Sequence, residues 1–166
     1  SNKNKRAWAC PVLATVRLLL VSLWTLLIML FYAVYRAVVR DQERRYITAT
    51  AGTHVWGRVC CWLMGYTITI EGTPPAGGAL VAPNHLGYAD IILLSACCRC
   101  LFVAKSEVEG WTLFGQGAKL YQHIFVERRR AHSMMETRNA VVERLESGHN
   151  VCIFLEGTSS GGVEIL

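Results

Sequence analysis

Hydrophobic residues are most concentrated near the start of the chain. Residues 18–35 read LLLVSLWTLLIMLFYAVY, which are 18 residues without a formal charge, bounded by Arg17 and Arg36. A helix of this length extends roughly 27 Å at ~1.5 Å per residue, close to the thickness of the hydrocarbon core of a bilayer. A domain of this size could hardly bury every face of such a helix. The pattern therefore predicts a membrane helix over 18–35 that either crosses the bilayer or dips into one leaflet.

Basic residues flank this helix on both sides. Residues 1–17 form a basic N-terminal flank, and residues 36–65 form a segment in which apolar and charged residues are mixed. We expect this segment to be membrane-proximal and helical, with a short apolar helix at 55–64. Counted over Lys and Arg, the positive-inside rule slightly favours a cytoplasmic location for the C-terminal side of the helix. We therefore expect a membrane protein whose functional site faces the cytoplasm.

From residue 66 onward, the pattern changes to short apolar strands that alternate with helices. Residues 66–71 (YTITIE) alternate with period two, which predicts a strand. The alternation as a whole predicts an α/β fold, a mixed sheet covered by helices, over 66–166. Because the chain ends just after a loop, we expect the C-terminal part of this domain to be missing. Further strands are predicted at 79–82, 100–104, 123–127 and 151–155, and helices at 89–96, 111–121 and 132–147.

The overall composition narrows the class of protein. With 52% hydrophobic and 17% charged residues, the chain is too apolar to be disordered. Its net charge of +5 fits a protein that works beside anionic lipid. Without a concentrated basic face, this charge does not indicate a nucleic-acid partner.

The cysteines indicate a reducing compartment rather than a disulfide framework. There are seven, an odd number, and two pairs are adjacent in sequence. Cys97 and Cys100 form a CxxC pattern, but it follows a predicted helix, whereas a redox motif needs an exposed helix N-terminus. No second CxxC or His pair completes a zinc site. We predict ordinary buried thiols and no metal.

The first motif that could carry chemistry is NHLGYAD at 84–90, directly after a predicted strand. His85 and Asp90 would lie about 140° apart on one helix, so they meet only if His85 lies in a turn and Asp90 in the first helical turn. We expect Gly87 to give the backbone this freedom. A carboxylate that accepts from one imidazole nitrogen leaves the other nitrogen as a base. The simpler interpretation is a surface loop with an aspartate at the helix N-cap.

Two further motifs end predicted strands. IFVERRR at 124–130 ends in three arginines, whose guanidinium groups suit phosphate or carboxylate; the simpler interpretation is a solvated charge run. FLEGTSSGG at 154–162 opens a buried strand into a small-residue loop, whose N–H groups could approach an anion or acyl group closely. Here the simpler interpretation is a plain turn. Each motif alone is weak evidence for a function. The three motifs in this order, behind a membrane segment, are a more specific indication.

Together the motifs resemble those of the glycerolipid acyltransferase family, in particular the 1-acylglycerol-3-phosphate (lysophosphatidate) and related lyso-lipid acyltransferases. The resemblance covers roughly residues 55–162. NHLGYAD matches the NHxxxxD motif of that family, IFVER matches FxxR, and FLEGTSS is similar to FPEGTRS. The resemblance implies the fold of that family behind an N-terminal membrane helix.

The resemblance also implies an activity. An acyl group would pass from acyl-CoA or acyl-carrier protein to the hydroxyl of a lyso-lipid in the membrane, with no cofactor beyond the acyl donor. His85 would act as the general base, Asp90 would orient and polarise it, and Arg128 would bind the anionic head of the acceptor. The other residues that the resemblance assigns to substrate binding are Asn84, Lys105, Glu156, Gly157 and Thr158.

Three positions depart from the family pattern. Leu155 stands where proline is usual, Ser159 where arginine is common, and Gln122 where glycine is common. These changes bear on the identity of the acceptor more than on the acyl-transfer reaction. They place another head group, such as that of a lyso-ornithine lipid, beside lysophosphatidate as an expected acceptor.

Two other functions fit parts of the sequence. One is a membrane-anchored thiol oxidoreductase that uses Cys97 and Cys100. The other is a truncated lipid-binding membrane module without catalysis. The first would depend on thiols and not on His85, and the second would bind lipid without His85 or Asp90.

Overall fold

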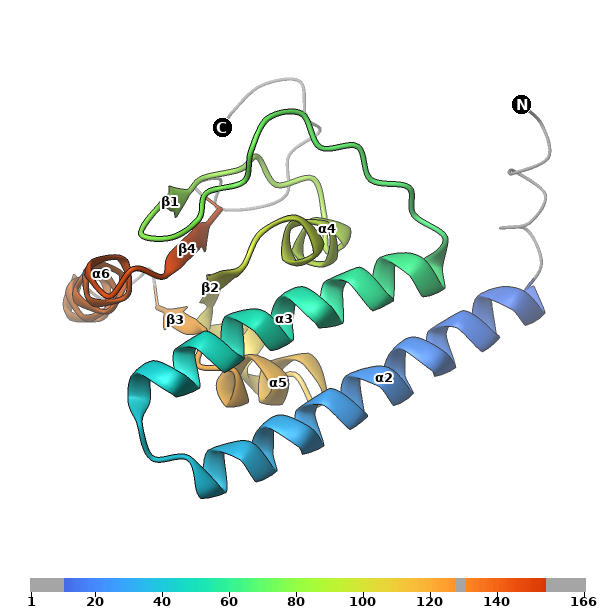
Figure 1. Ribbon diagram of the computed structural model, residues 1–166, viewed down its shortest axis with the longest axis horizontal. Helices are drawn as coiled ribbons and strands as arrows, with labels where there is room; N and C mark the ends of the chain where they lie inside the picture. The colour runs from blue at the N-terminus through green and yellow to red at the C-terminus, as the bar shows by residue number, and fades with distance from the viewer. Residues whose placement is uncertain (1–10, 128–130, 155–166) are drawn as a thin grey trace.

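The computed structural model describes residues 11–127 and 131–154, with two long helices packed against a small α/β domain (Figure 1). The long helices are α2 (Pro11–Val38) and α3 (Gln42–Met64). The α/β part begins with β1 (Leu80–Val81), α4 (Ala89–Cys97), β2 (Cys100–Lys105) and the 3-10 helix η1 (Ser106–Gly110). It continues with α5 (Phe114–Leu120), β3 (Ile124–Val126), α6 (Ala131–Glu146) and β4 (Asn150–Ile153).

Helix α2 has one buried stripe and one exposed apolar face. It extends beyond the predicted helix at 18–35 on both sides. The Tyr32 ring stacks on Tyr121, with ring centroids 4.4 Å apart, in a core cluster that includes Leu101 of β2. Among the described residues, α2 is long and apolar enough to cross a bilayer, judged by length and composition alone. Its buried residues follow the spacing of one helix face: Val21, Thr25, Ile28 and Tyr32.

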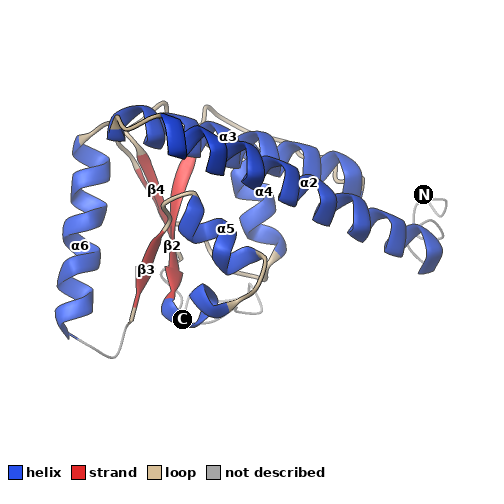
Figure 2. Cartoon of the chain, turned by 90° about the horizontal axis from the view of Figure 1, so that it is seen from below, coloured by secondary structure: helices blue, strands red, loops and turns tan. Residues whose placement is uncertain are grey.

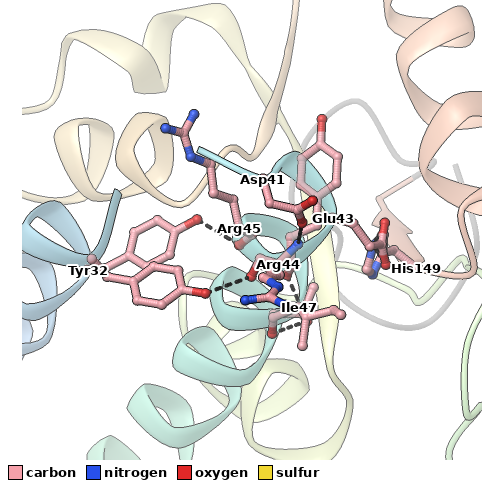
Figure 3. Close-up of polar contacts among 10 residues, drawn as sticks. Tyr32, Asp41, Glu43, Arg44, Arg45, Ile47 and His149 are labelled. Atoms are coloured by element: carbon pink, nitrogen blue, oxygen red, sulfur yellow. Dashed lines mark hydrogen bonds and ion pairs between the residues drawn. The ribbon is translucent and has the colours of Figure 1, made fainter. Parts of the chain in front are cut away.

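Helix α3 extends well beyond the short helix expected at 55–64, because its first turns are capped and packed. Asp41 is the N-cap, and its Oδ1 accepts a hydrogen bond from the Arg44 N–H at 2.8 Å. The Tyr32 hydroxyl of α2 donates to the Arg45 carbonyl oxygen at 2.8 Å (Figure 3). The first half of α3 carries few large apolar residues, so this packing leaves little trace in the sequence.

Residues 66–71 are not a strand, which corrects the prediction. The segment pairs with none of the described strands, and most of its side chains are exposed. Its Thr and Ile residues have high β-propensity, but a strand is stabilised by cross-strand partners that this segment lacks. It connects α3 to the short edge strand β1 instead (Figure 1).

The sheet has the order β1-β4-β2-β3, and all of its described pairings are parallel. Helix α6 covers one face, against Val103 and Val151, while α4 covers the other, against Phe102 and Cys152 (Figure 2). The predicted α/β fold, a sheet covered by helices, is confirmed, although the described strands pair in parallel throughout and do not form the mixed sheet that was expected. Because parallel strands end at the same edge, β1, β2 and β4 all end on the side of the sheet from which the loop after β1 leaves.

Helices α3 and α4 are in close contact where Gly57 faces the end of α4. A Cβ on Gly57 would lie 2.6 Å from the backbone nitrogen of Ala96 and 2.7 Å from the Cβ of Ser95. Next to this contact, the His54 Nδ1–H donates to the Ser95 carbonyl oxygen at 2.8 Å. The absence of a side chain at Gly57 therefore sets how deeply α4 packs against α3.

Asn150 joins three segments at the start of β4. Its side chain is buried, and its Oδ1 accepts from the Ala79 N–H at 3.0 Å. Its Nδ2 donates to the carbonyl oxygens of Pro75 at 3.0 Å and Arg99 at 3.1 Å. The preceding residue, His149, contacts Glu43 of α3 at 3.2 Å (Figure 3). One buried amide thus connects β4 to the segment before β1 and to the turn before β2.

We predict that Asn150→Ala lowers the free energy of unfolding by about 3 kcal/mol, because three backbone groups lose their hydrogen-bond partner at once. Urea unfolding in detergent, followed by circular dichroism, measures the change. Asn139→Ala on the exposed side of α6 is the matched control, with an expected change within about 0.5 kcal/mol. Equal changes in the two variants would show that the Asn150 amide does not join these segments.

Candidate active site

The loop after β1 and the first turn of α4 bring His85 and Asp90 together. Strand β1 ends at Val81, the loop carries His85, and Asp90 lies in the first turn of α4. The Nδ1 of His85 lies 3.0 Å from Oδ2 of Asp90. The predicted meeting of these side chains, one in a turn and one at a helix start, is confirmed. Their catalytic roles stay predictions.

One carboxylate oxygen of Asp90 accepts three hydrogen bonds. Besides His85, the backbone N–H groups of Leu86 and Gly87 donate to Oδ2 at 2.6 Å and 2.9 Å. This oxygen is therefore an acceptor, and His85 donates its Nδ1 proton to it. The neutral imidazole then has its lone pair on Nε2. A general base needs this tautomer when its partner carboxylate is on the other side of the ring.

The backbone conformation of this turn does not require glycine, contrary to the expectation for Gly87. Its φ does not lie in the left-handed region, and a Cβ at this position would meet no atom within 4 Å. The two N–H groups that donate to Asp90 close the turn instead. Hydrogen bonding, rather than glycine flexibility, gives the loop its shape.

Phe154, just after β4, holds the His85 ring from its face. The two ring centroids are 4.1 Å apart, and the planes differ by 27°. The parallel pairing of Val81 with Cys152 explains the contact, since β1 and β4 leave the sheet side by side. The His85 side chain remains 18% exposed. The imidazole is thus fixed by Asp90 at one edge and Phe154 on one face, and part of it stays open.

The other predicted substrate-binding residues fall into two groups. Lys105 ends β2 and has an exposed side chain, at the sheet edge from which the His85 loop leaves. Asn84 directly precedes His85 and is also exposed. The remaining residues lie outside the described part of the chain: Arg128, Glu156, Gly157 and Thr158.

Within the described part of the chain, the cysteines around the CxxC pattern do not form an accessible redox motif. Burial raises the pKa of Cys97 at the end of α4, and hydrogen bonding with Cys152 raises the pKa of Cys100. Hydrogen bonding with Cys100 lowers the pKa of Cys98 to about 7, but the Cys98 side chain is buried. A thiol oxidoreductase needs an accessible thiol of low pKa. Within residues 11–127 and 131–154, no three His, Cys, Asp or Glu side chains are placed to hold a metal ion.

An apolar cavity lies between the two long helices and the α4 face of the sheet. Its volume is about 130 Å³, comparable to an apolar cavity that holds a small hydrocarbon, and it has an open mouth. Ile91, next to Asp90 in α4, forms part of its wall, as does His123 before β3. The sequence shows His123 only as the start of a predicted strand. The walls come from elements far apart in the chain, so no local pattern could have predicted this site.

The arrangement of these elements is similar to that of a solved acyltransferase. The crystal structure of the 1-acyl-sn-glycerophosphate (LPA) acyltransferase PlsC from Thermotoga maritima aligns with a TM-score of 0.63. The alignment covers 92% of this chain and 66% of that chain, with 21% sequence identity. At this identity the similarity shows the fold alone.

The sequence comparison gives the family. Residues 66–166, more than half of the chain, match the Acyltransferase family. The chain is 37% identical over 112 residues to the lyso-ornithine lipid O-acyltransferase of Rhizobium meliloti (strain 1021), which covers 67% of this chain and 38% of the relative. It is 34% identical over 89 residues to the 1-acyl-sn-glycerol-3-phosphate acyltransferase of Neisseria gonorrhoeae, which covers 54% of this chain and 35% of the relative. The chain therefore belongs to the Acyltransferase family, and it spans less than half the length of these curated relatives.

We predict that neutral His85 carries its proton on Nδ1 and that Asp90→Asn weakens this preference. An uncharged amide accepts hydrogen bonds less strongly than a carboxylate, and its own N–H can donate to Nδ1. Two-bond ¹H–¹⁵N NMR of histidine-labelled protein distinguishes the two tautomers. Asp41→Asn is the control, because asparagine also caps α3. A proton on Nε2 in the unchanged protein would contradict the assignment.

Proposed function

We propose that the protein is a membrane-bound O-acyltransferase that transfers a fatty acyl group from acyl-CoA or acyl-carrier protein to the hydroxyl of a lyso-lipid. The observation that carries this proposal is the 3.0 Å contact of His85 with Asp90, in a chain that belongs to the Acyltransferase family. The contact directs Nδ1 to the carboxylate and leaves Nε2 to receive a proton.

In this reaction His85 activates the acceptor. An alcohol is a poor nucleophile at neutral pH, so Nε2 takes the hydroxyl proton as the oxygen attacks the thioester carbonyl carbon. The new C–O ester bond forms, the C–S bond breaks, and the proton passes from His85 to the leaving thiolate. Asp90 stabilises the imidazolium between these two proton transfers, and Phe154 keeps the ring in plane. The reaction needs no covalent acyl-enzyme and no cofactor beyond the acyl donor.

We assign acceptor binding to the sheet edge where β2 and β4 end. Lys105 supplies a cation at this edge, and the family resemblance adds Arg128, with Asn84, Glu156, Gly157 and Thr158. Ser159 stands where the family pattern has an arginine suited to phosphate. The similarity to a relative named lyso-ornithine lipid O-acyltransferase agrees with this change. We therefore place lyso-ornithine lipid first and lysophosphatidate second among the acceptors.

We place the enzyme on the membrane through α2. Its outward face exposes large apolar side chains, among them Leu19, Leu30 and Phe31, which water solvates poorly. The positive-inside rule slightly favours the cytoplasmic side for the α/β domain, and we propose that its active site faces the cytoplasm. The apolar cavity, which α2, α3, α4 and the sheet help to line, suits part of the hydrocarbon chain of the acyl group.

We predict that His85→Ala lowers acyl transfer by about 100-fold or more, since a positioned general base contributes this much or more. Membranes that carry the protein are given radiolabelled acyl-CoA or acyl-carrier protein, with lyso-ornithine lipid or lysophosphatidate as the acceptor. His132→Ala, at an exposed position on α6, is the matched control and retains transfer. If transfer and acceptor binding fell equally in His85→Ala, His85 would be a structural residue.

The same membranes separate the other two functions. A thiol oxidoreductase would lose its activity when cysteines are alkylated and keep it in His85→Ala. A non-catalytic module would bind lyso-lipid with no transfer from either donor. Transfer that depends on His85 and survives alkylation excludes both.

A further inference from the structure

The apolar cavity has polar groups in its wall, and most of them are already paired. The Thr25 hydroxyl donates to the Val21 carbonyl oxygen at 2.7 Å and accepts from Trp56 Nε1 at 2.9 Å. The Ser95 hydroxyl donates to the Ile91 carbonyl oxygen at 2.6 Å. These protons point back into the protein and not toward a bound chain.

The hydroxyl of Tyr121 is also paired within the protein, because it donates to the Ile28 carbonyl oxygen at 2.8 Å. Apart from Thr53 and His123, the rest of the described wall is aliphatic or aromatic and offers no partner to an oxygen atom. A plain hydrocarbon chain would therefore fit most of the cavity without leaving a polar group unsatisfied.

Among the described polar residues of the wall, Thr53 and His123 are the exceptions, and only the ring of His123 is held by a hydrogen bond. Its Nδ1 lies 3.1 Å from the backbone nitrogen of Phe102, and a backbone N–H can only donate. Nδ1 is therefore the acceptor, and the proton of the neutral ring is on Nε2. Among the described residues, no group within hydrogen-bond distance accepts that proton. Burial lowers the pKa of His123 to about 4, so the ring stays neutral at physiological pH.

We propose that the Nε2–H of His123 selects acyl chains that carry an oxygen substituent, a hydroxyl or keto group, along the hydrocarbon chain. The inference rests on the proposed function, because it takes the cavity as the acyl site. His123 lines the cavity and is only partly buried, so water can reach its donor before a chain binds. A methylene chain would displace this water without pairing with the donor, which costs free energy. A site built to hydrogen-bond a substrate oxygen rejects the analogue that lacks this oxygen.

The side chain also has a rigid support. The His123 ring meets the Phe102 ring edge to face, with centroids 5.5 Å apart and planes at 80°. Together with the bond from the Phe102 N–H, this contact fixes the direction of Nε2. The preference should therefore depend on where the oxygen lies along the chain, and not only on its presence.

Binding is measured first, because it does not require turnover. The purified protein in detergent holds a fluorescent fatty acid, which is displaced by a plain fatty acid or by isomers of equal length with one hydroxyl at successive carbons. We expect one or two neighbouring isomers to bind about tenfold more tightly than the plain acid. The same isomers, supplied as acyl-CoA, should show the same preference in kcat/KM.

The discriminating variant is His123→Asn. The asparagine oxygen can take the place of Nδ1 and keep the bond from the Phe102 N–H, while no atom replaces Nε2–H. We expect this variant to lose the preference for the hydroxylated isomer and to bind the plain acid within about threefold of the unchanged protein. His132→Asn, at the exposed position on α6, is the matched control and keeps the preference.

Three outcomes are informative. Equal binding of all isomers and the plain acid would overturn the inference, because an ordered water would then satisfy His123 as well as a ligand does. A preference that persists in His123→Asn would assign it to another group. Failure of His85→Ala to reduce transfer would overturn the proposed function, but the displacement series would still test His123.

If the asparagine variant does not fold, a shift of the His123 Nε2–H signal in NMR with the hydroxylated acid alone supports the same inference.

Discussion

The Oδ2 atom of Asp90 accepts hydrogen bonds from His85, Leu86 and Gly87, three consecutive residues that would otherwise form an open loop. Hydrogen bonds to a charged oxygen are about twice as strong as neutral ones, so one carboxylate is enough to fold this turn. The same charge sets the tautomer of the imidazole. Loop shape and proton placement thus have one cause, and any change at Asp90 alters both.

The position of that oxygen depends on the scaffold behind it. Helix α4 carries Asp90, and the close approach at Gly57 sets its depth against α3. Strand β4 brings Phe154 to the other side of His85, and Asn150 connects the start of that strand to the segment before β1. Contacts at the opposite end of the sheet therefore determine how the imidazole is held.

Local patterns in the sequence predicted the alternating α/β order and the meeting of His85 with Asp90, because these features involve residues close together in the chain. Contacts between residues far apart in the chain could not be predicted from these patterns. The Phe154 ring reaches His85 only through strand pairing, and the cavity around His123 is assembled from distant elements. Residues 66–71 show the opposite case, since strong β-propensity there has no neighbouring strand to pair with.

Helix α2 belongs to the hydrophobic core as well as to the outer surface. Ile28 and Tyr32 pack with Leu101 and Tyr121, and the Arg36 guanidinium donates to the Leu120 carbonyl oxygen at 3.0 Å. A shortened chain that began after α2 would expose this apolar surface to water and open the cavity along one wall. Removing the helix would therefore give a domain that is prone to aggregate and whose cavity is partly collapsed.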